Sequence, residues 1–323
     1  MYSENMSDFK LNYAPKRTMF AKTCSAEDAA CFIEAMRKQE ATGYATRNYL
    51  RTVEGEDHAE PSVRGKSALN CEDLVKSDCR SRMVEWCFQV ADFCKYERET
   101  IEISMNSLDR FLGTPQGRAV LKDRKAFQLA AMTCLYTAIK VHEPEAMEPQ
   151  MMSGLSRGIY SAKQFETMEL EILAANQWRV NAPTSMSFVR LFFALFPDGA
   201  LKDEELTAVF ELAKYQTELS VGENSLVGVS PSTIALAAIA NALQAVDDLE
   251  LKYAYIESIS ETAKVDILSD MFVKTRGLLW RAVDMERHDQ QRHMMLQSAS
   301  VAKKVAERSS TIHGSPRAVV STV

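Results

Sequence analysis

Apolar residues recur with helical spacing through the middle of the chain. In residues 79–95 they recur three and four positions apart, and residues 99–112 repeat the pattern. This spacing places apolar side chains on one face of a helix that packs against a core. Residues 122–141 are apolar almost all round, which predicts a helix at the centre of a bundle, with other helices packed about it.

Turn and capping residues bound these helices. Gly113 and Pro115 predict the end of the second helix, because glycine suits a helix end and proline cannot continue a helix. After a short fourth segment at 148–158, Ser161 and Gln164 predict the N-cap of a fifth helix. The sequence therefore predicts five helices in this half of the chain, with the third the most apolar.

The pattern recurs more weakly in the second half. Five further helices are predicted, over residues 184–195, 202–221, 230–245, 251–259 and 261–283. Pro231 favours the start of the third of these, since proline is well placed at the first helical position, and the apolar run that follows predicts that this helix is again buried. No alternating run bounded by turn residues indicates a strand. We therefore predict an all-α chain with two tandem five-helix units.

Composition and charge narrow the function classes. The 323 residues are 46% hydrophobic and 25% charged, which is typical of a globular protein. No apolar run reaches the length of about 18 residues that a membrane span needs, and the N-terminus lacks the pattern of a secretory signal, so we expect the nucleus, the cytoplasm or both. The net charge of −6 argues against binding to a nucleic-acid backbone.

Candidate chemistry is sparse. The seven cysteines contain no Cys-x-x-Cys pair and have no histidine at ligand spacing, so we expect reduced thiols and no metal or cofactor. The chain carries no dinucleotide-binding glycine motif, P-loop, His-Glu-x-x-His or serine elbow. We therefore predict no catalytic residues and a function in binding.

Short motifs between residues 80 and 184 resemble the cyclin box in order and spacing. They are Arg82-Met83-Val84-Glu85-Trp86, Met105-Asn106-Ser107-Leu108-Asp109-Arg110-Phe111-Leu112, Phe127-Gln128-Leu129-Ala130, Ala138-Ile139-Lys140, Met168-Glu169-Leu170-Glu171-Ile172-Leu173 and Ala182-Pro183-Thr184. The five positions that best define the box all match: Arg80, Asp109, Leu129, Lys140 and Glu169. The chain thus resembles a cell-cycle cyclin of the A, B or D kind, of a divergent protist or algal type.

The resemblance also divides the chain. Residues 79–182 correspond to the N-terminal cyclin box and residues 183–285 to the C-terminal cyclin fold. Residues 39–78 are expected to hold a pre-box helix, on the likeness of Tyr49-Leu50-Arg51, and a linker. We expect a partly disordered N-terminal arm over residues 1–38 and a basic flexible tail over residues 286–323.

The resemblance implies a non-catalytic regulatory subunit that forms a heterodimer with a cyclin-dependent kinase and activates it to control cell-cycle progression. In the family, Lys140 and Glu169 hydrogen-bond backbone groups that flank the mobile helix of the kinase. A solvated surface ion pair is the alternative interpretation for these two residues. Thr137, Val141, Leu173 and Trp178 line the expected kinase face, with core packing the alternative for each.

The resemblance to cyclins also implies roles for two further sets of residues. Arg80 and Asp109 are expected to form a buried ion pair that ties the first box helix to the second. The groove that captures Arg-x-Leu motifs of substrates and inhibitors corresponds to Cys79, Arg82, Met83, Trp86, Gln89 and Gln128. Cys79 replaces a methionine, Arg82 a branched aliphatic residue, and Gln89 a glutamate that receives the arginine of the motif. We therefore expect this docking function to be weakened.

A second function remains open from the sequence. A transcription-type cyclin, or a cyclin-fold scaffold that activates no kinase, would share the double five-helix fold. A DNA-binding module should carry a basic face, and the net charge of −6 with the Lys140 and Glu169 match argues against it.

Overall fold

The computed structural model describes residues 25–49 and 75–286. The chain falls into two units, residues 1–280 and residues 281–323. In the second unit residues 281–286 are described, and they are helical. The account below concerns the first unit. Most of the expected arm, Leu50 and Arg51 with the linker, and the tail beyond residue 286 lie outside the described residues.

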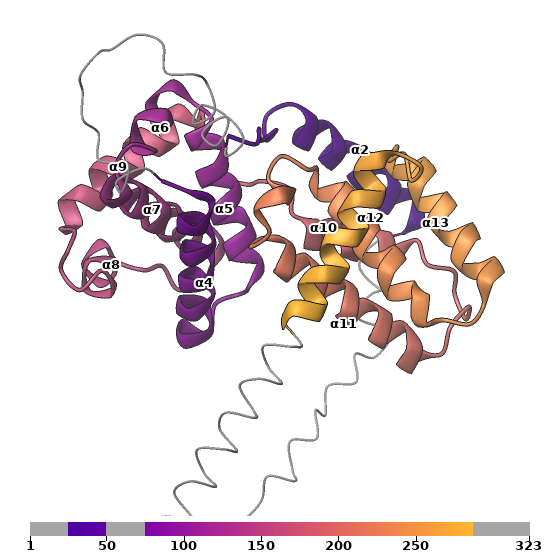
Figure 1. Ribbon diagram of the computed structural model, residues 1–323. Helices are drawn as coiled ribbons and strands as arrows, with labels where there is room; N and C mark the ends of the chain where they lie inside the picture. The colour runs from indigo at the N-terminus through magenta and orange to yellow at the C-terminus, as the bar shows by residue number, and fades with distance from the viewer. Residues whose placement is uncertain (1–24, 50–74, 287–323) are drawn as a thin grey trace, which may run out of the picture. The chain divides into compact units, whose positions relative to one another are not determined.

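The first helical bundle surrounds one buried helix. It contains α4 (Ser77–Cys94), α5 (Glu99–Leu112), α6 (Pro115–Val120), α7 (Arg124–His142), α8 (Pro149–Leu155) and α9 (Ala162–Ala175). Every residue of α7 from Leu129 to Ile139 is buried. In Figure 1 α7 lies among the other helices of this bundle. The predicted central position of this helix is confirmed.

Capping residues set the helix boundaries. Ser161 and Gln164 form the predicted capping box of α9, in which the side chain of each accepts a hydrogen bond from the backbone N–H of the other. The short helix α6 was not predicted. Pro115, taken as the end of α5, also occupies the first turn of α6, with Thr114 as the N-cap that accepts from the Gly117 N–H. Proline at this position stops one helix and starts the next.

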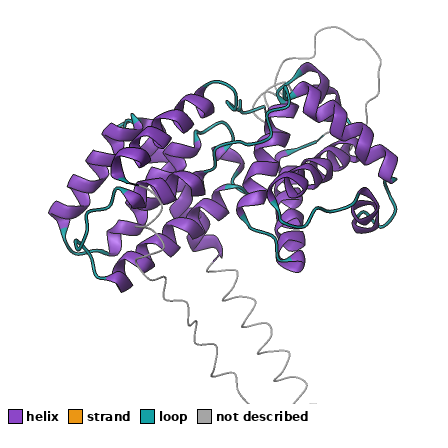
Figure 2. Ribbon diagram, turned by 180° about the vertical axis from the view of Figure 1, so that it is seen from behind, coloured by secondary structure: helices purple, strands orange, loops and turns teal. Residues whose placement is uncertain are grey.

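The second bundle repeats the arrangement around α12. It contains α10 (Ser185–Ala194), α11 (Asp203–Ser220), α12 (Pro231–Ala242), α13 (Leu249–Ala263) and a last helix from residue 270, with the short 3-10 turns η1 (Asn224–Leu226) and η2 (Leu243–Ala245). All residues of α12 from Ile234 to Ala242 are buried. No strand occurs within residues 25–49 and 75–286 (Figure 2). The all-α, double-bundle prediction is confirmed.

The predicted helix over residues 261–283 was wrong at its start. Helix α13 runs on to Ala263 and ends where Lys264 adopts a left-handed conformation with φ of 52°. The last helix begins only at residue 270. A lysine gives no sequence signal for this turn, because left-handed geometry is expected of glycine or asparagine.

Helix α2 (Ala26–Ala41) precedes both bundles and packs on the second one. Ile33 is fully buried in the core of the second bundle, where α2 packs against α10 and α13 (Figure 1). The Glu40 carboxylate accepts hydrogen bonds from the Ser232 N–H at 3.0 Å and the Ser232 hydroxyl at 2.6 Å, at the start of α12. The sequence predicted part of a partly disordered arm here, and the boundary drawn at residue 38 falls inside this helix.

No helix forms at Tyr49, where the resemblance placed a pre-box helix. Residues 45–49 are non-helical, and the Tyr49 side chain is buried. The Tyr49 hydroxyl donates to Asp109 Oδ1 at 3.0 Å. In the described residues, this segment therefore leaves α2 without forming a helix, and the buried Tyr49 holds it against the first bundle.

Two carboxylates of α5 hold the first turn of α10, where the chain passes from one bundle to the other. Glu99 accepts from the hydroxyls of Thr184 and Ser187 and pairs with Arg190 at 2.6 Å. Glu102 accepts from the Ser185 N–H at 2.6 Å. Such carboxylates satisfy N–H groups that have no partner within the helix and complement its dipole.

The two carboxyls differ in proton affinity. Burial alone would raise the pKa of Glu99, but Arg190 and the two hydroxyls outweigh it and lower that pKa. Burial raises the pKa of Glu102 to about 7, and the Ser185 hydrogen bonds only partly oppose it. Glu102 therefore changes charge near neutral pH.

Glu102 should make the stability of the protein depend on pH. Between the ordinary glutamate pKa of about 4.3 and a folded-state value of about 7, the folded chain binds more protons than the unfolded chain. The free energy of unfolding therefore falls as pH rises through this window, by at most about 1.4 kcal/mol per pH unit, and the loss is complete above it. We expect Glu102→Gln to remove this slope in urea unfolding measured from pH 5 to 8. Glu211→Gln, at an exposed position of α11, should leave the slope unchanged, and parallel curves for all three proteins would exclude this role of Glu102.

Candidate functional site

Lys140 and Glu169 form an ion pair on the surface of the first bundle. Lys140 lies in the last turn of α7 and Glu169 in the middle of α9, two helices that pack against each other (Figure 1). The Lys140 Nζ lies 2.6 Å from Oε1 and 2.8 Å from Oε2 of Glu169. The Lys140 side chain is 40% exposed and that of Glu169 only 11%. The structure thus brings together the two residues that the sequence singled out.

Neighbouring side chains hold the pair in place. The hydroxyl of Thr137, which is buried, lies 3.1 Å from Glu169 Oε1 and 3.0 Å from the Thr133 carbonyl. The Lys140 ammonium lies over the ring of Tyr136, 5.0 Å from its centroid, in a cation–π contact. The buried Thr137 hydroxyl therefore orients the Glu169 carboxylate. The Lys140 ammonium has three N–H donors and is partly exposed, so it can also donate to a partner at the surface.

The helices that carry the pair, and the segment that follows α9, also expose apolar side chains. Val141 is 47%, Leu170 59% and Trp178 65% exposed, and Leu173 is half-buried. We call the surface formed by Lys140, Val141, Glu169, Leu170, Leu173 and Trp178 the Lys140 face. Exposed apolar groups around a fixed polar pair are typical of a protein-binding surface. Thr137 belongs beneath this face, as a buried supporting residue.

Leu170 was not predicted as part of this face. The signal was present, because Leu170 falls off the buried stripe of α9, which comprises Phe165, Met168 and Ile172. An apolar residue outside the buried stripe of an amphipathic helix has no core to pack against. Trp178 gave no such signal. It follows α9 in a left-handed conformation with φ of 58°, and its N–H donates to the Leu173 carbonyl at 2.8 Å.

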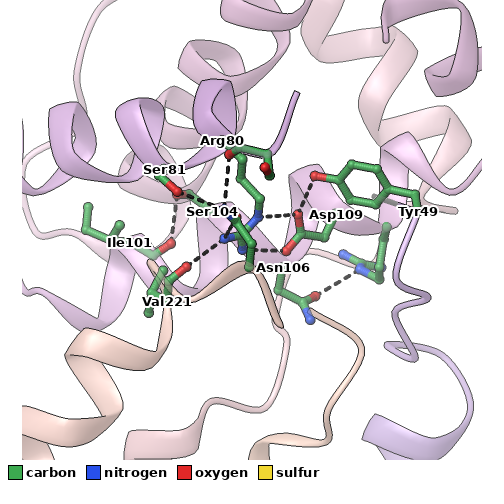
Figure 3. Close-up of polar contacts among 11 residues, drawn as sticks. Tyr49, Arg80, Ser81, Ile101, Ser104, Asn106, Asp109 and Val221 are labelled. Carbon is green, nitrogen blue, oxygen red and sulfur yellow. Dashed lines mark hydrogen bonds and ion pairs between the residues drawn. The ribbon is translucent and has the colours of Figure 1, made fainter. Parts of the chain in front are cut away.

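Arg80 and Asp109 form a buried bidentate ion pair between α4 and α5. The Arg80 Nε donates to Oδ1 of Asp109 at 2.9 Å and Nη2 to Oδ2 at 2.8 Å. Figure 3 shows Arg80 and Tyr49 converging on Asp109 from two sides. Burial would lower the pKa of Arg80, but Asp109 outweighs it and raises that pKa, while burial, with Asp109 adding to it, raises the pKa of Tyr49. Arg80 is therefore charged and the Tyr49 hydroxyl protonated.

Arg80 also reaches the second bundle. Its Nη1 donates to the Val221 carbonyl at 2.8 Å, beyond the end of α11 (Figure 3). A second contact joins the same two bundles: the Asn224 side-chain amide in η1 donates to the Ser77 carbonyl at 3.1 Å and to the Ser81 hydroxyl at 2.8 Å, both on α4. The pair expected to join two helices therefore joins the two bundles as well, which no local sequence pattern indicates.

The residues of the expected docking groove lie on α4 and α7. Met83 is buried, and Cys79 and Trp86 pack partly buried against the core. Arg82 has its side chain 76% exposed and pairs with Asp78 at 3.0 Å, one turn back on α4. Gln89 is exposed, and the Gln128 side-chain oxygen accepts from the Tyr160 hydroxyl at 2.9 Å. Arg82 thus presents a charge to solvent beside the half-buried Trp86.

Two buried thiols have perturbed pKa values. Burial raises the pKa of Cys134 to about 12 and raises that of Cys87 as well, so both stay protonated. Within the described ranges, no cluster of three or more His, Cys, Asp or Glu side chains could hold a metal ion. Among the helices of those same ranges, none combines the length and the apolar character that a bilayer crossing needs.

Family models match both bundles. The model described as "Cyclin, N-terminal domain" matches residues 35–181, and "Cyclin, C-terminal domain" matches residues 183–270. The chain belongs to the cyclin family. Cyclins are in general non-catalytic regulatory subunits, which agrees with the absence of catalytic motifs from the sequence.

Curated relatives of this cyclin include mitotic and A-type members. It is similar to the G2/mitotic-specific cyclin-B1 of Oryzias latipes, with 29% identity over 220 residues, which cover 66% of this chain and 49% of that protein. It is also similar to Cyclin-A1-2 of Oryza sativa subsp. japonica, with 27% identity over 192 residues, 59% of this chain and 38% of that protein. The match therefore spans half or less of the length of these relatives.

The fold of this cyclin resembles that of a solved viral cyclin. The X-ray structure of a viral cyclin from Herpesvirus saimiri superimposes with a TM-score of 0.51 and 17% identity, covering 65% of this chain and 86% of that chain. At this identity the likeness concerns the fold alone. It agrees with the tandem helical bundles described above.

Proposed function

We propose that this cyclin binds and activates a cyclin-dependent kinase that drives cell-cycle progression. The observation that carries the proposal is the Lys140–Glu169 pair, held at 2.6 Å on two helices that also expose apolar side chains. An apolar surface gives binding energy, and a fixed charged pair within it gives register, because misdocking would leave a charge desolvated and unpaired. The likeness to A- and B-type cyclins supports the cell-cycle role.

The mechanism follows from what a protein kinase needs. A kinase is active only when a mobile helix carries a glutamate to the lysine that binds the ATP phosphates. A partner that binds the active position of that helix more tightly than the inactive one shifts the equilibrium toward activity. The buried helix α7 makes the Lys140 face rigid. From it, the Lys140 ammonium can donate to backbone carbonyls of the kinase, and Glu169 can accept from backbone N–H groups.

A direct experiment distinguishes a chain that activates the kinase from one that binds the kinase without activating it. The purified chain is mixed with a purified mitotic-type cyclin-dependent kinase, and both complex formation and phosphorylation of a histone substrate are measured. We expect a one-to-one complex with raised kinase activity. Complex formation without activation would favour the alternative, a cyclin-fold scaffold, and absence of any complex would contradict the proposed partner class.

Substrate docking through α4 should be weak. Arg82 adds a positive charge where a basic Arg-x-Leu peptide would approach, and Gln89 lacks the negative charge that would receive its arginine. We expect no binding of a fluorescent Arg-x-Leu peptide at micromolar concentration in a polarisation assay. The combined variant Arg82→Ile and Gln89→Glu should gain binding. Micromolar affinity of the unaltered chain would show that docking is retained.

A further inference from the structure

The ion pair of the Lys140 face is too exposed to hold its own geometry. Lys140 and Glu169 both have long side chains with several rotatable bonds, and the Lys140 side chain is 40% exposed. An ion pair open to solvent gains little from its mutual attraction, because water screens the charges and both side chains must be ordered. Ordering such a side chain on binding commonly costs about twofold to tenfold in affinity. Contacts that order the pair beforehand would therefore strengthen the binding of a partner.

Thr137 on α7 supplies the first contact of this kind. Its side chain is buried, and its hydroxyl lies 3.1 Å from Glu169 Oε1 and 3.0 Å from the Thr133 carbonyl. The hydroxyl has one proton for these two acceptors. Within helix α7 the Thr133 carbonyl already accepts from the backbone N–H of Thr137, whereas the Glu169 carboxylate is charged and gains more from a further donor. The Thr137 hydroxyl therefore favours the observed orientation of Glu169.

Tyr136, the preceding residue on α7, supplies the second contact. Its side chain is buried, and the Lys140 Nζ lies 5.0 Å from the centroid of its ring. The two residues are four positions apart, so their side chains are neighbours along the helix. The face of an aromatic ring attracts an ammonium group, and the attraction strengthens as the ammonium loses water. The buried ring therefore restricts the positions that the Lys140 ammonium occupies.

We propose that Tyr136 and Thr137 are positioning residues, which hold Lys140 and Glu169 in one arrangement before the kinase binds. Tyr136 is 4% and Thr137 6% exposed, so neither offers the kinase much surface of its own, and their effect on binding is exerted through the pair. This inference rests on the proposed kinase-binding function. It assigns part of the affinity for the kinase to two side chains buried beneath the Lys140 face.

Two substitutions of Thr137 separate positioning from packing. Thr137→Val keeps the shape of the side chain and removes the hydroxyl, whereas Thr137→Ser keeps the hydroxyl and removes a buried methyl group. We expect Thr137→Val to weaken binding to a purified mitotic-type cyclin-dependent kinase about threefold to tenfold, with little change in the urea midpoint. Thr137→Ser should lower the urea midpoint, because it leaves a small cavity, yet bind within about twofold of the unaltered chain. Surface plasmon resonance on the full chain and urea unfolding of each variant measure the two effects.

Thr133 provides the matched control. It is also buried, it lies one turn earlier on α7, and its hydroxyl donates to the Leu129 carbonyl at 2.7 Å. Thr133→Val therefore removes a comparable hydroxyl from the same helix and should leave kinase binding unchanged. At the second position, Tyr136→Phe retains the aromatic ring and should keep most of the affinity, whereas Tyr136→Leu should weaken binding about threefold.

The outcomes distinguish this inference from the proposed function. If Thr137→Val and Tyr136→Leu bound the kinase as tightly as the unaltered chain, the positioning role would be excluded while kinase binding stands. An equal loss of binding in Thr137→Val and Thr137→Ser, or in Thr133→Val, would also exclude it, because the effect would then come from packing within α7. If the unaltered chain did not bind the kinase at all, the proposed function would be overturned and the inference with it.

Discussion

Arg80→Ala is expected to lower the free energy of unfolding by about 3–5 kcal/mol, the usual cost of removing one partner from a buried ion pair. Arg80 is 4% and Asp109 5% exposed, so water cannot replace the lost guanidinium. The Asp109 carboxylate would keep only the Tyr49 hydroxyl among its described partners. The Val221 carbonyl would lose its Arg80 donor as well, which weakens the junction of the two bundles.

Urea unfolding followed by circular dichroism measures this loss, and helix α4 supplies the matched control. Arg82 lies two residues away on the same helix and pairs with Asp78, but both side chains are largely exposed, at 76% and 65%. Arg82→Ala should therefore change the free energy of unfolding by less than about 1 kcal/mol. Tyr49→Phe, which removes one neutral donor, should cost about 1 kcal/mol. Equal effects of Arg80→Ala and Arg82→Ala would contradict a structural role for the buried pair.

The helices that could be predicted most securely from sequence are those that consist almost entirely of apolar residues. Helices α7 and α12 are apolar on nearly all sides, which only a central position explains. Helix α2 was underestimated because its stabilising contacts are remote in sequence: Glu40 caps a helix that begins some 190 residues later. Tyr49 shows the same limit, since its partner Asp109 is 60 positions away.

Less of the Lys140 face than of the fold could be predicted from the sequence. Helical periodicity alone could not bring Lys140 and Glu169 together, because they lie 29 residues apart on different helices; the resemblance to the cyclin box supplied the pairing. The exposure of the apolar side chains on the Lys140 face is set by packing. Leu170 could have been found from its place off the buried stripe of α9, whereas the exposure of Trp178 depends on a left-handed turn that tryptophan does not predict.

Lys140→Ala and Glu169→Ala are each expected to weaken kinase binding by about 30-fold or more. Truncation of a charged residue at the centre of an interface commonly costs about 2 kcal/mol or more, part of which is the penalty of leaving its partner buried and uncompensated. Lys140 is 40% exposed in the free protein, so its loss should lower the free energy of unfolding by no more than about 1 kcal/mol. Binding and folding should therefore respond differently to the same substitution.

That difference distinguishes the Lys140 face from the buried Arg80 pair. Lys140→Ala should retain the circular dichroism spectrum of the unaltered chain, with only a small shift of the urea midpoint, yet fail to co-purify the kinase. Arg80→Ala should lose kinase only in proportion to the unfolded fraction. Lys274→Ala removes the same charge from an exposed position of the second bundle and should bind normally. If both Lys140→Ala and Glu169→Ala captured the kinase as well as the control, their ion pair would be an ordinary surface contact, and the kinase would have to bind elsewhere on the chain.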